Sequence, residues 1–231
     1  MLKMWGRPTS TCTQRVLWTL TEAAVPYELT LASATMGDKG HIWLGHTPYG
    51  IVDSPSYLAM NPNGSIPAID DDGFILWESN TVTRYLAAKY AVTHAATHAV
   101  TQGAGTLMPA DLQVRADAER WMDWATTTMA PVMTPLFWGL IRTPAEKRDP
   151  AAIESLRLEM EGVMRILDAR LATRAYVAGD ALTVGDIPVG CFTYRWYALP
   201  IEHGEHPHLA RWYHALTERP AFRQHVMLPL T

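Results

Sequence analysis

The chain has 231 residues, 48% of them hydrophobic and 18% charged, and its formal net charge at pH 7 is −4. These values predict a globular protein with a sizeable core, and the weak acidity without a basic stripe argues against a nucleic-acid partner. The sequence has no apolar run long enough to predict a membrane-spanning helix. Its two cysteines, Cys12 and Cys191, suggest neither a disulfide framework nor a metal motif. Since no signal pattern is present at the N-terminus, we expect a cytoplasmic protein.

The N-terminal end predicts a strand, a helix and a second strand. Leu2–Trp5 and Tyr27–Leu31 are strand-like, and apolar residues recur at helical spacing between them, from about Thr13 to Ala24. A βαβ unit of this kind implies parallel pairing, and ligands usually bind at the loop after its first strand, here Gly6–Cys12. The next segment, residues 32–56, is irregular and predicts a long loop that is either functional or a surface excursion.

Residues 61–90 contain two features that suggest a binding site. Pro67 interrupts a short apolar run, and since proline cannot donate to a ladder it indicates an edge, a bulge or a cis peptide bond. Glu78-Ser79 opens a predicted helix, where free N–H groups attract an anion while the carboxylate can hold an ammonium group. Together they suit the headgroup of an amino acid. The alternative is that Ser79 is an ordinary N-cap and Glu78 a solvated side chain.

Residues 91–106 are mostly small and polar and predict a connection between two domains. His94 and His98 in this segment have the spacing of metal ligands on a helix. No carboxylate or cysteine lies near them in the sequence, so we expect no metal site.

The C-terminal part predicts helices. Pro109–Trp138 has helical spacing with a kink or break at its internal prolines, and residues 149–171 carry a long apolar stripe. Further on, Thr183 and Asp186 have the spacing of a capping box. In that motif the Thr183 hydroxyl would cap the helix by accepting a backbone N–H, and the Asp186 carboxylate would accept the Thr183 backbone N–H in return. Two shorter helices are expected near residues 208–217 and 220–226.

The pairs Ile66-Pro67 and Glu78-Ser79, at this mutual spacing, resemble the glutathione-binding half of the cytosolic glutathione S-transferase family, in particular its bacterial serine-type, theta- or beta-like members. The resemblance implies a thioredoxin-like α/β domain over residues 1–91 and an all-α domain over residues 106–231, with a linker at residues 92–105. It also implies a homodimer, with glutathione as co-substrate and no metal.

The resemblance assigns the parts of glutathione to particular residues. Glu78 is expected to bind the γ-glutamyl ammonium group, and Ser79 the neighbouring carboxylate. Ile66, aligned by a cis Pro67, is expected to pair with the cysteinyl backbone. His41 lies in a segment, residues 34–48, that looks inserted relative to other family members, and it is expected to meet the glycine carboxylate.

The role of activating the glutathione thiol has two candidate residues. Ser10 stands where serine-type members of the family have their serine, and Cys12 stands near the cysteine of the bacterial cysteine-type class. Thr9, Thr11 or a backbone amide are the remaining alternatives. A loop hydroxyl and a small buried residue are the non-catalytic interpretations of Ser10 and Cys12.

These expectations define a function and its alternatives. The chain is expected to conjugate the glutathione thiolate to small hydrophobic electrophiles, as in detoxification. A disulfide or peroxide reductase that uses Cys12 and a non-enzymatic glutathione-binding module are the alternatives. The second substrate is not identified by the sequence. By position, the helical residues expected to bind it, with core packing as the other interpretation, are Trp121, Trp124, Thr128 and Phe137.

Overall fold

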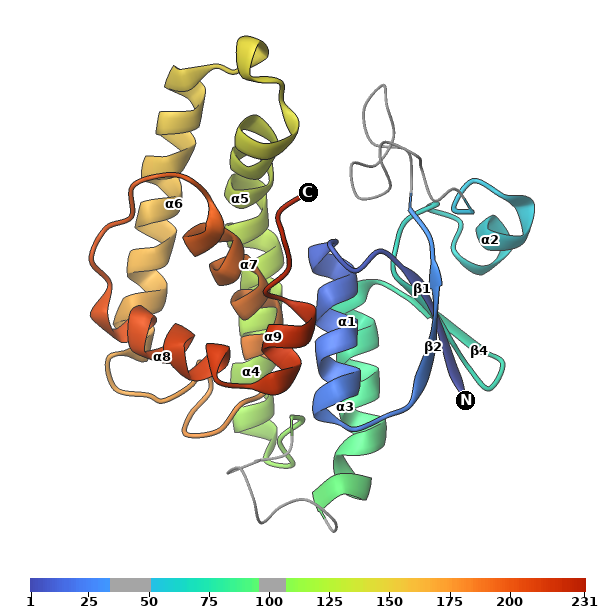
Figure 1. Ribbon diagram of the computed structural model, residues 1–231. Coiled ribbons are helices and arrows are strands. Elements are labelled where there is room, and N and C mark those ends of the chain that lie inside the picture. The colour runs from blue at the N-terminus through green and yellow to red at the C-terminus, as the bar shows by residue number, and fades with distance from the viewer. Residues whose placement is uncertain (34–50, 96–106) are drawn as a thin grey trace.

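The computed structural model describes residues 1–33, 51–95 and 107–231 (Figure 1). A small sheet domain and a helical domain lie side by side, and two helices of the first domain face the second. The predicted insertion at residues 34–48, with His41, lies outside the described residues. So do residues 96–105 of the predicted linker.

The sheet has the strand order β2-β1-β3-β4 over the described residues. β1 pairs in parallel with β2, as the βαβ pattern predicts, while β3 pairs antiparallel with both β1 and β4. The turn between β3 and β4 has positive φ at Asp72 (53°) and Gly73 (92°), a conformation that glycine adopts without strain. The strands are β1 (Leu2–Gly6), β2 (Tyr27–Leu31), β3 (Ala68–Asp71) and β4 (Phe74–Trp77).

Helices α1 (Thr11–Glu22) and α3 (Ser79–Ala95) cover the face of the sheet that is turned toward the helical domain, and α2 (Pro55–Met60) lies away from it (Figure 1). α3 continues to Ala95, into the first residues of the predicted linker. The apolar residues of α1 and α3 form one core with β1 and β3, made of Leu2, Met4, Val16, Leu17, Leu20, Ala23, Val25, Ile69, Val82 and Leu86.

The second domain begins with a long helical run that contains two π-helical segments, η2 and η3. Pro131 stands in the first turn of α5, and Pro135 lies inside it. Where the sequence predicts a kink or break, the helix changes between α-helical and π-helical turns. Such π-helical turns are common near functional sites. The elements are α4 (Leu112–Trp124), η2 (Ala125–Met129), α5 (Ala130–Phe137), η3 (Trp138–Arg142), η4 (Ala145–Lys147), α6 (Pro150–Leu171), α7 (Asp186–Ala198), α8 (Pro207–Thr217) and α9 (Pro220–His225).

The predicted capping box at the start of α7 is half right. The Asp186 carboxylate accepts the Thr183 backbone N–H at 2.9 Å, as expected. The Thr183 hydroxyl, however, donates to the same carboxylate at 3.1 Å instead of capping the helix. Asp186 is fully buried and also accepts from the Val177 N–H and the Trp212 indole, both at 3.0 Å, so it binds three segments together.

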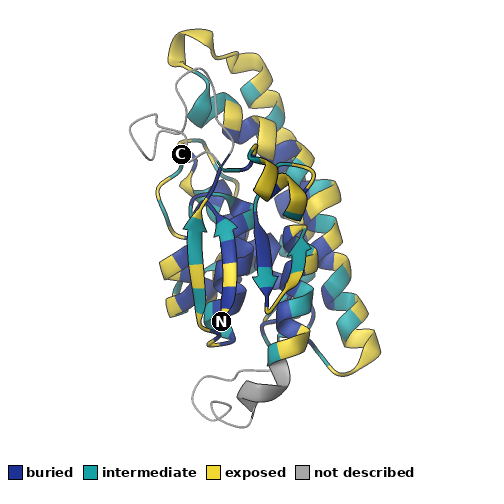
Figure 2. Cartoon of the chain, turned by 90° about the vertical axis from the view of Figure 1, so that its right-hand side faces the viewer, coloured by how far each residue is buried: buried dark blue, intermediate teal, exposed yellow. Residues whose placement is uncertain are grey.

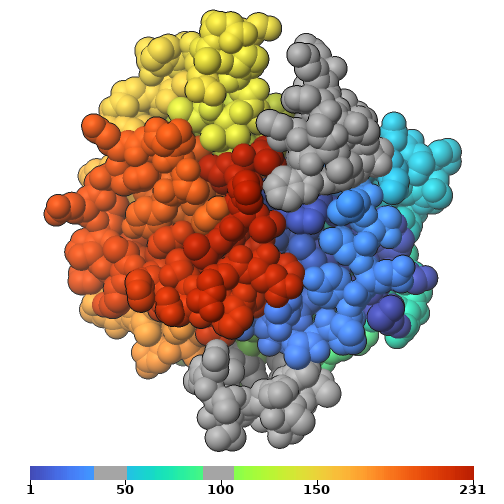
Figure 3. Space-filling model, in the orientation of Figure 1, coloured from blue at the N-terminus to red at the C-terminus, as the bar shows by residue number. Residues whose placement is uncertain are grey.

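α1 is in contact with elements of both domains. Thr13 to Leu20 is buried throughout, because α1 shares a core with the sheet and is also in contact with α7 and α9. Figure 2 shows buried residues, in dark blue, behind the strands of the sheet. Trp18 packs edge-on against Phe222 with the ring centroids 4.9 Å apart. A Cβ atom at Gly190 would lie 3.0 Å from both the Trp18 ring and the Leu216 side chain, so α7 packs tightly against α1 at this glycine. The last residues of the chain, dark red, run along this junction at the surface (Figure 3).

Candidate functional site

The loop after β1 presents an unused hydroxyl at the start of α1. Ser10 occupies the N-cap position in an extended conformation, and its carbonyl accepts the Gln14 N–H at 2.8 Å. Its side chain makes no capping bond and no other hydrogen bond within the described residues. The Ser10 hydroxyl is half-buried and can therefore bond to a ligand at a helix N-terminus.

The neighbouring threonines are less suited to that role. The Thr9 hydroxyl accepts a bond from the Thr231 hydroxyl at 2.9 Å, and the Thr9 carbonyl accepts from Arg195 at 3.3 Å. Thr11 is buried. Thr9 therefore holds the loop against the helical domain.

Cys12 lies in the first turn of α1, half-buried and without a disulfide. Cys191 on α7 is fully buried, and burial raises the pKa of its thiol to about 12. Of the two cysteines, Cys12 is thus the accessible thiol. Ser10 and Cys12 lie at the start of the same helix, so both remain candidates for activating the thiol.

The start of α3 differs from a simple Ser79 cap. Glu78 occupies the capping position, because its carbonyl accepts the Val82 N–H at 2.8 Å, and Ser79 is the first helical residue. Glu78 has φ of 71°, an uncommon value for a residue with a side chain and one that is found at ligand sites. Its carboxylate is exposed and bonds to no other described residue. The carboxylate and the free N–H groups of α3 therefore offer opposite charges side by side.

Arg15 is a functional candidate that sequence reasoning missed. Its guanidinium donates to the Ser79 hydroxyl at 3.2 Å and to the Asn80 side-chain carbonyl at 3.1 Å. The side chain is only 5% exposed and stacks 5.0 Å from the centre of the Phe192 ring. A buried positive charge thus lies next to the predicted anion site. Its only signal in the sequence is that it is the single charged residue of the segment 11–21.

The peptide bond between Ile66 and Pro67 is cis, which confirms one of the expected alternatives. The preceding loop is held by two bonds to the Ser65 carbonyl, from the Tyr57 hydroxyl at 2.6 Å and the Asn61 amide at 2.8 Å. β3 begins only at Ala68, so the Ile66 backbone groups take no part in the sheet pairing of the described residues. Backbone groups outside a sheet ladder can pair with an extended peptide.

The four residues expected to bind the electrophile do not form one surface. Phe137 is fully buried and Trp121 is 7% exposed, and both belong to the core of the helical domain. Trp124 packs against Trp121 with the ring centroids 4.9 Å apart, and is half-buried, as is Thr128 in η2. Core packing is therefore what the structure shows for Phe137 and Trp121. Among the described residues, no group of three side chains is arranged to hold a metal ion.

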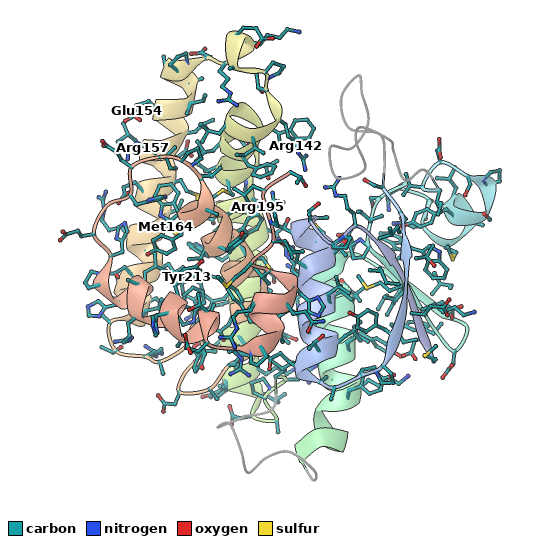
Figure 4. The ribbon with its side chains drawn as sticks, viewed as in Figure 1. Arg142, Glu154, Arg157, Met164, Arg195 and Tyr213 are labelled. Atoms are coloured by element: carbon teal, nitrogen blue, oxygen red, sulfur yellow. The ribbon has the colours of Figure 1, made fainter. Side chains whose placement is uncertain are left out.

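Two arginines of the helical domain stack on Phe137. The guanidinium carbon of Arg195 lies 4.1 Å from the ring centre, and that of Arg142 lies 4.9 Å from it. Figure 4 shows both on the side of the helical domain that faces the sheet domain. Burial, together with the charges of Arg7 and Arg195, lowers the pKa of Arg142 to about 9. Burial likewise lowers the pKa of Arg195 to about 10.

The chain matches known protein families over both domains. The glutathione S-transferase N-terminal domain model matches residues 9–89, and the C-terminal domain model matches residues 129–220. The chain is 40% identical to glutathione S-transferase GstB of Escherichia coli K12 over the whole of both proteins. It is 30% identical to glutathione S-transferase 3 of Zea mays over 97% of this chain and 93% of the relative.

Solved structures agree with these relatives. A theta-class glutathione S-transferase of Xanthomonas axonopodis pv. citri, with glutathione bound, superposes with a TM-score of 0.85 at 38% identity, covering 100% of this chain and 99% of the other. The α/β domain followed by a helical domain is the glutathione transferase fold. The chain belongs to the glutathione S-transferase family. Within its described residues, no helix has the length and apolarity needed to cross a membrane.

Proposed function

We propose that this chain conjugates the thiolate of glutathione to small hydrophobic electrophiles. The observation that carries the proposal is the hydrogen bond from Arg15 on α1 to Ser79 at the start of α3. It holds the two helix starts close together, because Arg15 is about one turn from the first residue of α1. One helix start then offers Ser10 to the thiol while the other binds the γ-glutamyl headgroup.

Each part of glutathione has a partner in this arrangement. The Glu78 carboxylate binds the γ-glutamyl ammonium group, and the Ser79 hydroxyl and N–H bind the γ-glutamyl carboxylate. The Ile66 backbone, next to cis Pro67, pairs with the cysteinyl unit. His41, outside the described residues, is retained as the proposed partner of the glycine carboxylate.

The chemical step requires a thiolate. A free cysteine thiol has a pKa of about 8.5, so little of it is ionised at pH 7. A hydrogen bond from the Ser10 hydroxyl and the dipole of α1 both favour the charged form. Lowering the thiol pKa by about two units requires about 2.7 kcal/mol, which one charge-assisted hydrogen bond and a helix dipole can supply.

Titration calorimetry with glutathione, followed by steady-state kinetics with a panel of electrophiles, tests the proposal. Ser10→Ala is expected to lower kcat strongly while the Kd for glutathione stays nearly unchanged. Cys12→Ala is the matched control at the same helix start and is expected to retain conjugation. Unchanged kcat in Ser10→Ala would remove Ser10 from this role.

A second candidate function follows from the accessibility of Cys12. Its half-buried thiol near the proposed glutathione site suits a disulfide or peroxide reductase that forms a mixed disulfide with glutathione. Mass spectrometry after treatment with oxidised glutathione detects that adduct. Its absence, with conjugation intact in Cys12→Ala, would exclude the reductase. Glutathione binding without turnover of any electrophile, peroxide or disulfide would instead indicate a non-enzymatic binding module.

The remaining expectations concern the protein as a whole. We propose that it is a cytoplasmic homodimer with a role in detoxification. Its glutathione-binding domain is proposed to end near the end of α3. The electrophile is proposed to bind against the helical domain, beside Trp124 and Thr128. Both side chains are half-buried, unlike Trp121 and Phe137. Light scattering coupled to size-exclusion chromatography tests the dimer, since a monomer mass would contradict it.

A further inference from the structure

Thr9, the residue before Ser10, is held by the helical domain at two points. Its carbonyl accepts a hydrogen bond from Arg195 of α7 at 3.3 Å, and its hydroxyl accepts from the Thr231 hydroxyl at 2.9 Å. Thr9 is only 3% exposed, so both bonds are shielded from solvent. We call Arg195, Thr231 and their two bonds to Thr9 the Thr9 clamp.

Both partners of Thr9 are themselves anchored in the helical domain. Thr231 is the last residue of the sequence, and an oxygen of its carboxylate accepts from Arg142 at 3.1 Å. The guanidinium carbons of Arg195 and Arg142 lie 4.1 Å and 4.9 Å from the centre of the Phe137 ring. Phe137 is fully buried in the core of that domain. The clamp therefore connects the loop before α1 to a packed core.

The backbone around Ser10 is fixed by further hydrogen bonds. The Ser10 N–H donates to the Arg7 carbonyl at 2.9 Å, and the Ser10 carbonyl accepts from the Gln14 N–H at 2.8 Å. The Arg7 N–H donates to the Thr13 hydroxyl at 3.3 Å, which ties the beginning of the same loop to α1. Within the described residues, the hydroxyl is the one polar group of Ser10 without a partner.

The clamp fixes the peptide unit that sets the direction of the Ser10 side chain. The Thr9 carbonyl and the Ser10 N–H belong to one planar unit. Arg195 holds the oxygen of this unit and the Arg7 carbonyl holds its N–H, so the plane cannot turn freely. Turning it would change φ of Ser10 and move the hydroxyl. A misplacement of about 1 Å at a reacting group can lower a rate about a hundredfold.

We propose that the Thr9 clamp positions the Ser10 hydroxyl for the glutathione sulfur, so that the helical domain contributes to thiol activation. This inference rests on the proposed role of Ser10 in glutathione conjugation. Arg195 and Thr231 are positioning residues, because they act through Thr9 and Ser10.

The clamp and the proposed binding groups for glutathione belong to different domains. Glu78, Ser79 and the Ile66 backbone all lie in the sheet domain, whereas Arg195 and Thr231 lie in the helical domain. Loss of the clamp should therefore lower kcat and leave the Kd for glutathione nearly unchanged. A residue needed only for folding would not produce that division.

Thr231→Val separates position from charge. It removes the hydroxyl that bonds to Thr9 and keeps the terminal carboxylate on Arg142, so the net charge of the region is unchanged. Replacement of Arg195 changes both position and charge. The charged and titratable groups that face Arg195 are Arg7, Cys12, Arg15, Arg142, Cys191 and Tyr194.

Three measurements test the clamp: kcat with chlorodinitrobenzene, the Kd for glutathione by calorimetry, and the pKa of the bound thiol from the ultraviolet absorbance of the thiolate. Arg195→Met should lower kcat about tenfold or more, and Thr231→Val about threefold, as expected for loss of a charged and a neutral hydrogen bond. Both should raise the pKa of the bound thiol, because a displaced hydroxyl stabilises the thiolate less. The Kd should change less than about twofold.

Arg195→Lys should recover part of the kcat that Arg195→Met loses, since lysine restores a donor for the Thr9 carbonyl. Arg219→Gln is the matched control. Arg219 is also a largely buried arginine of the helical domain, but it bonds to Glu22 at the other end of α1. At temperatures where it is folded, this variant should keep the kcat and the thiol pKa of the wild type.

The Ser10→Ala background shows whether the clamp acts through Ser10. There Thr231→Val and Arg195→Met should cause little further loss, because the hydroxyl that they position is absent. A further loss as large as in the wild type would overturn the inference.

Wild-type kcat and thiol pKa in Thr231→Val would also overturn it, as would a rise in the Kd that accounts for the loss of activity. If Arg195→Met does not fold, Thr231→Val decides alone. A wild-type protein that binds no glutathione, or that binds it without turnover of any electrophile, would overturn the proposed function itself. Normal turnover that is insensitive to the clamp variants would overturn this inference alone.

Discussion

Glu22 and Arg219 join the two domains through two parallel hydrogen bonds. Arg219 Nε donates to Glu22 Oε1 at 2.7 Å, and Nη2 donates to Oε2 at 2.6 Å. The side chains are 13% and 15% exposed, and the Trp18 indole also donates to Glu22 at 2.9 Å. This bidentate pair therefore fixes the end of α1 against the segment before α9.

Removing one partner of this pair should loosen the domain junction. Arg219→Met is expected to lower the free energy of unfolding by about 2–3 kcal/mol, since it leaves a largely buried carboxylate without its cation. The double variant with Glu22→Gln should lose less than the sum of the two single variants. Urea unfolding of all four proteins measures the coupling. Additive losses would show that the pair contributes no interaction energy. Glu154 is paired with Arg157 but its own side chain is 55% exposed, so Glu154→Gln should have a smaller effect.

Local features of the fold were predictable from the sequence, and long-range contacts were not. The strand-helix-strand pattern of residues 2–31 depends on neighbouring residues, so sequence reading found it. At Pro67 the residues left an edge, a bulge and a cis bond open, and only the family resemblance favoured the cis bond. The bond from Arg15 to Ser79 spans 64 positions and that from Arg195 to Thr9 spans 186. No periodicity in the sequence reports contacts of that kind.

In the second domain, helical spacing in the sequence could not show which residues line a pocket and which pack in the core. Trp121 and Phe137 have the spacing of a pocket wall and of a core equally well, and the packing of α6 and α7 around them decides for the core. Thr183 fits a capping pattern, but the fully buried Asp186 carboxylate attracts its hydroxyl instead. A buried charge overrides the local preference because it needs every available donor.

Replacement of Arg15 should weaken glutathione binding. In Arg15→Met the Ser79 hydroxyl and Asn80 side chain lose their donor, and the α3 N-terminus loses the nearby positive charge. We expect the Kd for glutathione to rise about tenfold, within the range for a hydrogen bond to a charged group. Calorimetry measures this, with thermal unfolding as a folding check. A lower Tm with an unchanged Kd would reduce Arg15 to a structural residue.

His225 should make stability depend on pH. It is 6% exposed on α9, and burial lowers the pKa of its imidazole below the ordinary value of 6.5. The unfolded chain therefore binds a proton more readily than the folded chain, and stability falls as the pH drops below about 6.5. In His225→Gln this loss should disappear. Tm values from pH 7.5 down to 5 test it, because parallel curves for the two proteins would exclude the histidine as the cause.

Asp186 should be more important to stability than the threonine beside it. Its Oδ1 accepts from the Val177 N–H and the Trp212 indole, and its Oδ2 accepts from the Thr183 N–H and hydroxyl. Asp186→Ala leaves three buried N–H donors without an acceptor, and we expect a loss of about 3–4 kcal/mol. Thr183→Ala removes one hydroxyl donor and should cost about 1 kcal/mol.

Asp186→Asn separates the two oxygens of that carboxylate. The amide oxygen can replace Oδ1 toward Val177 and Trp212, but the amide nitrogen is a donor and would then face the Thr183 N–H. The loss should therefore lie between those of Asp186→Ala and Thr183→Ala in urea unfolding. Because the site lies away from the glutathione residues, all three variants should keep wild-type glutathione affinity at temperatures where they are folded. A stable Asp186→Ala protein would show that burial of the carboxylate costs as much as its hydrogen bonds contribute.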